Sequence, residues 1–491
     1  MAKEISNTSK AIKGMSSQTI VTIVLGLVEI VSFSIMSRLL TQVDFGYYAA
    51  ITAITSIFST FSETGIGSAI IQQKELTNRY VNNAFTISLI FGSFISILLF
   101  SLAGQLAQSV ADISMKVPLM LMSVTLLLHC LTSVNISLMH RRLQFLRVGT
   151  INLISLIITT AIAICLAYKG YGYYAIITKA VLSSIITWLL SFILCKTKFG
   201  FALDKESFKR IFSFSGWLMA SSLFKNLAHQ IDRLLMPRLL SVAALGSYNR
   251  PKDFVEQISG KINGIFDTAL FPVLSGLQDN KPALQSAFRR SMYVMNIFAL
   301  LLTMSFMFNS GLLIRIFFGA QWMDLKPVMF VISSSLLFNM DGRLADCYLR
   351  SLAMTKQQFF FRIFETIIKT VGVLVGYKWG IIGVAITVVV TNFIAKLVKI
   401  IYVGGKIDIS TSQVINIILS SWKFATILLP ISIIAELFLP DTWGGDIAMA
   451  AIFAITVLFL FLFCPRFVGT KYESEIYFKL VPIIKKKLHI K

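Results

Sequence analysis

Long apolar stretches separated by short polar segments dominate this chain. Several of them, such as 84–102 and 447–464, approach or reach the ~20 residues that a helix needs to cross a bilayer. Their order predicts an all-α integral membrane protein with fourteen spans. The predicted spans are 15–38, 45–70, 83–104, 117–139, 149–168, 173–195, 211–238, 246–275, 288–314, 327–349, 359–377, 380–402, 412–436 and 446–465.

Two neighbouring spans, within 217–270, contain more charge than lipid tolerates. Lys225, His229 and Asp232 recur at i, i+4 and i+7, so they share one stripe of a helix. A charge at the bilayer centre costs at least ~2.5–3.5 kcal/mol, so such a stripe must face a watery cavity or a partner. The second span repeats the pattern with Arg250, Asp253, Gln257 and Lys261.

Composition and charge support the membrane class. Hydrophobic residues make up 56% of the chain and charged residues 14%, whereas soluble proteins have about 25% charged residues. The net charge of +22 does not indicate nucleic-acid binding, because Lys and Arg concentrate in alternate segments between the spans. This bias predicts that both termini are cytoplasmic. The basic tail, with Lys485–Lys487, is expected to contact anionic lipids.

The chain also contains an internal duplication. Residues 36–48 (MSRLLTQVDFGYY) align without a gap with 236–248 (MPRLLSVAALGSY), at an offset of 200 residues. Each copy contains an even number of spans, so the repeats should be related by an axis along the membrane normal. We therefore predict an N-terminal lobe (1–200, helices 1–6), a C-terminal lobe (201–405, helices 7–12), two extra helices (406–466) and a basic cytoplasmic tail (467–491).

These features resemble one family of transporters. The parallel six-plus-six repeat with two appended helices, SRLLTQVDFGYYAAI (37–51) and FSETGIGSAIIQ (61–72) are similar to polysaccharide exporters of the MOP flippase superfamily. Within it the chain is most similar to Wzx-type flippases, in the colanic acid and teichuronic acid exporter subgroup. The resemblance implies a V-shaped, MATE-like fold in a bacterial inner membrane. It also implies export of an undecaprenyl-diphosphate-linked oligosaccharide to the outer leaflet, and the sugar is left open.

The duplication indicates where function was added, because the charges lie in one copy only. At the offset of 200, Arg233 corresponds to Phe33 and Arg250 to Ala50. Arginine complements phosphate oxygens, so we expect the charged wall to bind the lipid diphosphate. The candidate substrate-binding residues are Arg233, Arg250, Lys252, Lys225 and Arg343. The candidates for a coupling ion or for gating are Asp232, Asp253, Glu63 and Glu29.

Structural roles for these charges stay open. Asp232 with Arg233, and Arg250 with Asp253, are neighbours of opposite sign and could neutralise each other. Glu365 and Lys369, at i and i+4, suit a structural ion pair at least as well as a ligand site. Asn339, Arg343 and Asp346 form a further stripe, with Asp341 close by.

Other classes of function are less consistent with the sequence. No nucleophile elbow, P-loop or metal-binding spacing is present, so we expect no enzyme, cofactor or metal. A MATE-type drug exporter shares the expected fold, but the slight basic excess within 217–270 favours an anionic substrate. A polysaccharide polymerase would need a large outside loop. A polymerase and glycosyltransferases are nevertheless expected as possible partners, together with membrane lipids.

Overall fold

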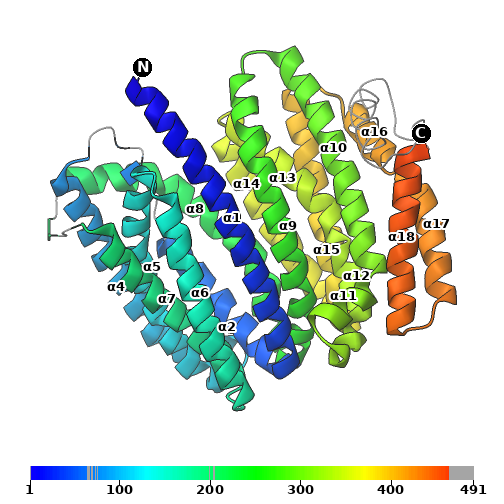
Figure 1. Cartoon of the computed structure of the whole chain (residues 1–491), viewed down its shortest axis with the longest axis horizontal. Coiled ribbons are helices and arrows are strands. Elements are labelled where there is room, and N and C mark those ends of the chain that lie inside the picture. Colours follow the sequence, from blue (N-terminus) through cyan, green and yellow to red (C-terminus); the bar gives the residue numbers. More distant parts are fainter. Residues whose placement is uncertain are drawn as a thin grey trace. The chain divides into compact units, whose positions relative to one another are not determined.

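The structure is entirely helical in the residues that it describes. This computed structural model describes residues 2–62, 67, 70, 71, 73, 76–197, 200–202 and 205–463. Every regular element within them is a helix (Figure 1). The chain forms two compact units, residues 1–249 and 250–491. The predicted all-α class is therefore confirmed, and the predicted lobe boundaries at 200 and 405 stay predictions.

The first unit is built of long helices joined by short turns. Its elements are α1 (Ala2–Leu39), α2 (Gln42–Ser62), α4 (Asn78–Val110), the 3-10 helix η1 (Ile113–Met115), α5 (Lys116–Arg141), α6 (Phe145–Tyr168), α7 (Tyr173–Cys195), α8 (Lys205–Leu239) and the start of α9 (Val242–Gly276). α5 packs against α4 and α7, and α6 packs against α1 and α7. α8 packs along α2.

The second unit contains more and shorter helices. After the rest of α9 come α10 (Lys281–Phe308), α11 (Ser310–Phe317), η2 (Ala320–Leu325), α12 (Lys326–Ser333), α13 (Ser335–Ser351), α14 (Thr355–Gly376), η3 (Tyr377–Trp379), α15 (Gly380–Lys406), α16 (Thr411–Ser421), α17 (Lys423–Phe438) and α18 (Trp443–Phe463). Its apolar core joins α10, α13 and α15 to α16, α17 and α18. The helices that follow α15 therefore belong to this core.

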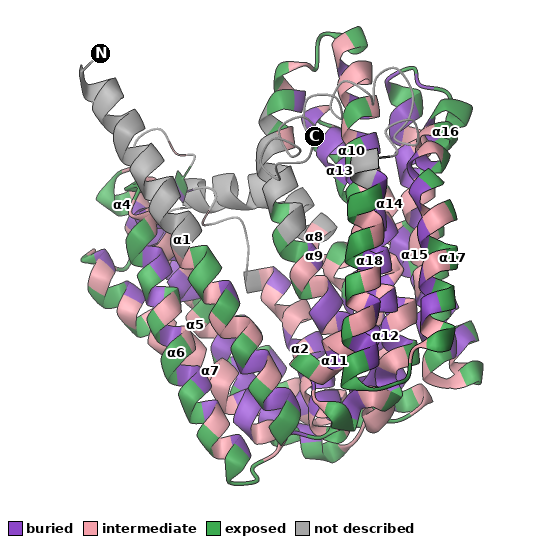
Figure 2. Ribbon diagram, turned by 45° about the vertical axis from the view of Figure 1, so that its right-hand side comes forward, coloured by how far each residue is buried: buried purple, intermediate pink, exposed green. Residues whose placement is uncertain are grey.

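The helices present apolar side chains outward. Phe94 and Ile97 on α4 are 61% and 67% exposed, and Leu437 and Phe438 on α17 are 76% and 83% exposed. Exposed positions recur along α6 and α17 in Figure 2, while buried ones face neighbouring helices. Among the described residues, nine helical segments are long and apolar enough to cross a membrane. The chain is therefore a multi-pass membrane protein.

Three predicted spans are interrupted helices. The span predicted at 288–314 breaks at Asn309, the one at 327–349 at Ser334, and the one at 412–436 at Trp422. Ser334 Oγ donates to Val331 O at 2.6 Å, and Asn309 Nδ2 donates to Ser305 O at 2.8 Å. Polar side chains that bond local carbonyls compete with the helical ladder, which favours breaks at these two positions.

The two turns that correspond to each other at the offset of 200 residues have the same geometry. α1 ends at Leu39 and α2 begins at Gln42, while α8 ends at Leu239 and α9 begins at Val242. In both turns a hydroxyl accepts a backbone N–H three residues on. Thr41 Oγ1 accepts from Asp44 N at 3.3 Å, and Ser241 Oγ accepts from Ala244 N at 3.0 Å. The duplication seen in the sequence is thus repeated in local structure.

The two repeated turns contact each other through glycines within the first unit. A Cβ atom on Gly46 would lie 1.9 Å from Val242 O, and one on Gly246 would lie 1.7 Å from Gln42 O. Because residues 42 and 46 correspond to 242 and 246, this contact is itself symmetric. Backbone oxygens cannot move aside as a side-chain end can. Both positions therefore require glycine.

We predict that Gly246→Ala destabilises the folded protein. The added methyl overlaps a backbone oxygen, and overpacking of this kind costs about 1–3 kcal/mol or more. The matched control is Gly260→Ala on the same helix, where a Cβ meets nothing within 4 Å. Membrane abundance and the thermal midpoint in detergent should fall for the first variant only. Equal behaviour of the two variants would contradict the close contact.

Candidate functional site

Asp232 is the best-buried of the predicted site residues in the first unit. Its side chain is 0% exposed, and Tyr248 donates its hydroxyl to Asp232 Oδ2 at 2.7 Å. Asp232 lies on α8 and Tyr248 on α9, so the bond links the two helices that the repeated turn connects. Arg233, 7% exposed, donates to Gln230 Oε1 at 3.1 Å. Charged groups held at this depth need compensation by specific partners.

The remaining predicted residues on α8 are more accessible. Lys225 and His229 are exposed, although the spacing placed them on one stripe with buried Asp232. Between them, Asn226 Nδ2 donates to Ser56 O at 2.9 Å and to Thr60 Oγ1 at 2.5 Å, which ties α8 to α2. α8 therefore presents a polar face that is buried at 232–233 and open at 225 and 229.

In the second unit, the start of α9 also buries predicted site residues. Arg250 is 6% and Lys252 5% exposed, and Asp253 is half-buried. Lys252 Nζ lies 3.9 Å from Glu256 Oε1, an i,i+4 ion pair. The convergence of Arg233 and Arg250 on one cavity stays a prediction.

The other three predicted residues differ in their surroundings. Arg343 is exposed on α13, and Glu29 is half-buried on α1. Glu63 lies outside the described residues, as does the predicted basic tail at 467–491.

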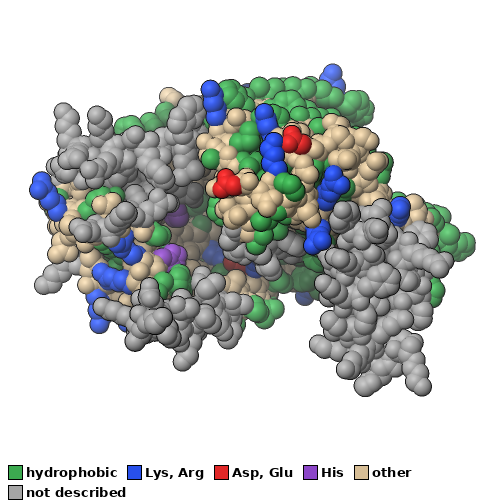
Figure 3. Space-filling model, turned by 90° about the horizontal axis from the view of Figure 1, so that it is seen from above, with side chains coloured by type: hydrophobic (Ala, Val, Ile, Leu, Met, Phe, Trp, Pro, Cys, Tyr) green, Lys and Arg blue, Asp and Glu red, His purple; other side chains and the backbone are tan. Residues whose placement is uncertain are grey.

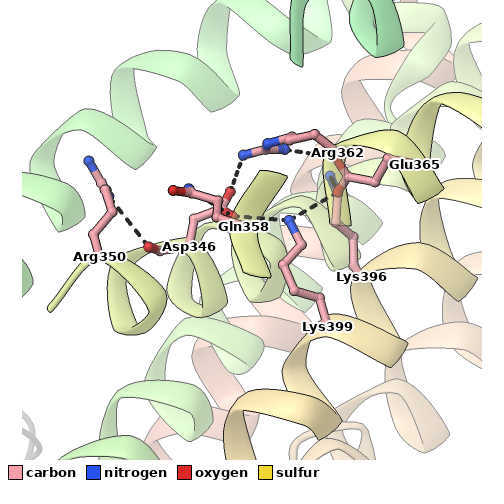
Figure 4. A network of polar contacts seen from close by, with 7 residues as sticks. All are labelled: Asp346, Arg350, Gln358, Arg362, Glu365, Lys396 and Lys399. Atoms are coloured by element: carbon pink, nitrogen blue, oxygen red, sulfur yellow. Dashed lines mark hydrogen bonds and ion pairs between the residues drawn. The ribbon is translucent and has the colours of Figure 1, made fainter. Parts of the chain in front are cut away.

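A buried ionic network in the second unit contains two acids that the sequence analysis named, Asp346 and Glu365, but its three cations were missed (Figure 4). Glu365 Oε1 lies 2.9 Å from Lys396 Nζ and 3.0 Å from Lys399 Nζ. Arg362 bridges the two acids, at 2.7 Å from Glu365 and 2.6 Å from Asp346. Lys399, 0% exposed, also reaches Asp346 at 3.1 Å. We call these five residues, from α13, α14 and α15, the ionic cluster.

The ionic cluster also contains charges in one copy of the repeat only. Leu143, after α5, and Ala353, after α13, both have positive φ, 55° and 54°. We take these two residues as counterparts, so the helices on either side of them correspond at an offset of 210 residues. Gly172 and Gly380, also at positive φ, set an offset of 208 for α7 and α15. By these offsets Asp346, Arg362, Glu365, Lys396 and Lys399 correspond to Ile136, Asn152, Ser155, Trp188 and Ser191. All five counterparts are uncharged.

The neutral counterpart forms hydroxyl bonds instead. Thr187 Oγ1 donates to Ser155 Oγ at 3.1 Å, and Ser155 Oγ lies 3.2 Å from Ser183 Oγ. Asn135 Nδ2 donates to Ser191 Oγ at 3.1 Å in the same unit. A shared structural need is thus met in the first unit without charge. Arg362 lies only three residues from Glu365, but the other two cations that bond this acid, Lys396 and Lys399, lie 31 and 34 residues from it, beyond the reach of helical spacing.

Comparison with known proteins places the fold in a class of transporters. A lipid II flippase MurJ structure in an inward closed conformation matches with a TM-score of 0.68 and 14% identity, over 90% of this chain and 98% of that one. An inward-facing multidrug resistance MATE family transporter of the MOP superfamily matches with a TM-score of 0.63 and 15% identity, over 82% of this chain and 99% of that one. The chain therefore has the fold of MOP-superfamily transporters.

Sequence comparison then gives the family. The model of the polysaccharide biosynthesis protein family matches residues 35–327, and this chain belongs to that family. The lipopolysaccharide biosynthesis protein WzxC of Escherichia coli (strain K12) is 21% identical over 393 residues, 79% of this chain and 80% of that protein. These comparisons confirm the predicted resemblance and the expectation of a transporter rather than an enzyme.

Proposed function

We propose that this protein flips an undecaprenyl-diphosphate-linked oligosaccharide from the cytoplasmic to the outer leaflet of a bacterial inner membrane, for surface polysaccharide synthesis. Membership of the polysaccharide biosynthesis protein family carries the proposal. The burial of Asp232, Arg233, Arg250 and Lys252 on α8 and α9 supports it, because intramembrane ionisable groups are functional by default. We also propose that the chain crosses the membrane fourteen times, as two six-helix lobes followed by two further helices.

The proposed mechanism is alternating access. Arg233, Arg250 and Lys252 hold the diphosphate through charge-assisted hydrogen bonds, with Lys225 and Arg343 at the more exposed edge. The polar sugar occupies a wet cavity while the prenyl tail stays in lipid. Asp232, Asp253, Glu63 and Glu29 are the acids proposed to bind a coupling ion or to gate. A polysaccharide polymerase and glycosyltransferases are the proposed partners.

Complementation tests the proposed function. Deleting the gene is expected to abolish the surface polysaccharide and to accumulate the lipid-linked oligosaccharide in the cytoplasmic leaflet, and the full chain should restore both. Unchanged surface polysaccharide in the deletion strain would reject the function. A MATE-type drug exporter would instead change drug susceptibility.

The charge distribution predicts the topology. Basic side chains outnumber acidic ones among the described residues on the face shown in Figure 3. Exposed basic residues also lie at turns that the span order places on one side: Arg142, Arg147, Lys196, Lys281, Arg290, Arg350, Lys356 and Lys406. By the positive-inside rule this side is cytoplasmic.

We therefore expect reporter fusions within residues 196–210 and at the C-terminus to report a cytoplasmic location. Both fusions follow an even number of predicted spans, so they should agree. A periplasmic signal from either fusion would contradict the proposed span count or its register.

A further inference from the structure

Asp341 is a buried acid that no cation neutralises in the described part of the second unit. It lies on α13, is 4% exposed, and sits among Leu337, Met340 and Leu344 of the apolar core. Its only hydrogen bond there comes from Asn296 Nδ2 on α10, which donates to Asp341 Oδ1 at 2.9 Å. The other acids that the structure shows as buried in this unit are paired with cations: Asp346 and Glu365 in the ionic cluster, and Asp446 with Arg315 at 2.6 Å.

The amide of Asn296 adds an oxygen that also lacks a partner. Asn296 is 1% exposed, and its Nδ2 donates to Met292 O at 2.9 Å as well as to Asp341. Its Oδ1 is buried and accepts no hydrogen bond. Buried acceptors without a partner are rare and costly. The pair therefore places a carboxylate beside an amide in surroundings from which water is largely excluded, with the amide nitrogen toward Asp341 and the amide oxygen without a partner.

We propose that Asp341 and Asn296 form a binding site for one small monovalent cation, a proton or Na⁺. Carboxylate and amide oxygens are the ligands that hard cations prefer. Half a turn of the Asn296 amide brings Oδ1 toward Asp341, where Na⁺ binds both oxygens or a proton on Asp341 is shared with Oδ1. Either cation neutralises the acid and supplies the partner that the oxygens lack.

The charges around the pair leave this role to a mobile cation. On the helices packed against α13, buried charged groups include Arg362 and Glu365 of α14 and Lys396 and Lys399 of α15, and Lys369 is also buried on α14. The four members of the ionic cluster among them, Arg362, Glu365, Lys396 and Lys399, are bonded to one another or to Asp346. The stem of Lys396 runs past Gly342, next to Asp341, yet its ammonium bonds Glu365.

The position of the pair suits a site that couples cation binding to transport. This role rests on the proposed function. Asp341 and Asp346 lie on the same helix, and Asp346 ties α13 to α14 and α15. Binding or release of a cation at Asp341 therefore changes the charge of the helix that joins α10 to the ionic cluster. A ligand shifts a conformational equilibrium only by its differential affinity for the two states. An uncompensated buried carboxylate provides that difference.

Carbodiimide labelling of the purified full-length protein tests the site without requiring transport. The reagent modifies protonated carboxyls in apolar surroundings, and peptide mass spectrometry locates the product. We expect labelling at Asp341 but not at Asp346, whose oxygens are held by Arg362 and Lys399. For a Na⁺ site, Na⁺ at about ten times its Kd should suppress labelling about tenfold relative to choline at constant pH. For a proton site, labelling should fall only as the pH rises, whatever the salt.

The isosteric variant Asp341→Asn provides the second measurement. A cation that binds only the folded state raises the thermal midpoint. The wild-type midpoint should therefore respond to the same cation that controls labelling, and Asp341→Asn should not respond. Labelling that neither cation changes, or equal thermal responses of the two proteins, would overturn the site.

Export assays separate this proposal from the proposed function. Loss of export in Asp341→Asn, at normal abundance, supports coupling through this site. Export at the wild-type level in Asp341→Asn would overturn the coupling role and leave the proposed function standing. A wild-type chain that restores no export would instead reject the proposed function, while the labelling would still decide whether the cation site exists.

Discussion

Arg250→Ala is expected to abolish polysaccharide export while the protein stays inserted and abundant. Arg250 is 6% exposed on α9, and its counterpart in the first repeat is Ala50. The repeated fold therefore does not itself require an arginine at this position. Arg250→Lys should retain part of the export, because the charge remains while the bidentate fork is lost. Surface polysaccharide and the accumulated lipid-linked oligosaccharide measure the effect.

A double variant distinguishes substrate binding from simple neutralisation of Asp253. If Arg250 only compensates that half-buried acid, Arg250→Ala leaves the acid unpaired, destabilises the protein and leads to degradation. Arg250→Ala with Asp253→Ala would then restore normal export, and our assignment would be wrong. If abundance is normal but the lipid-linked oligosaccharide still accumulates inside, the arginine contacts the substrate.

Lys399→Met is expected to produce the largest loss of stability. The Lys399 ammonium is 0% exposed and lies 3.1 Å from Asp346 and 3.0 Å from Glu365. Its removal weakens the compensation of two buried acids, and breaking a buried pair costs about 3–5 kcal/mol. The thermal midpoint in detergent and the abundance in membranes should both fall.

An exposed ion pair of similar length provides the matched control. Lys281 Nζ lies 2.8 Å from Asp408 Oδ2, with side chains 65% and 62% exposed. Water screens such a pair, so Lys281→Met should cost about 0–1 kcal/mol. Equal costs for Lys281→Met and Lys399→Met would mean that the ionic cluster is solvated and does not hold α13, α14 and α15 together.

Sequence patterns predicted the features that depend on local spacing. The end of α1 at Leu39 and of α8 at Leu239 follows from the duplication, and both turns have the same hydroxyl cap. The break at Ser334 was missed, because hydropathy counts the run 327–349 as one apolar span although serine side chains bond its carbonyls.

Contacts between distant helices could not be predicted in the same way. Lys396 and Lys399 lie near the end of the predicted span 380–402, and only packing of α15 on α13 and α14 brings them to Glu365 and Asp346. Asp341 and Asn296 are 45 residues apart, so no helical period connects them. The candidate residues on α8 and α9 could be proposed from the sequence because each stripe lies within one helix, and their role stays a prediction.

The mutual contact of Gly46 and Gly246 has a consequence for biogenesis. Residue 46 leaves the ribosome 200 residues before residue 246, an interval of roughly 10–40 s at about 5–20 residues per second. During this interval the backbone that packs against Gly46 has not been synthesised. We therefore expect a nascent chain that stops before residue 242 to leave the Gly46 backbone accessible to lipid or to the insertion machinery.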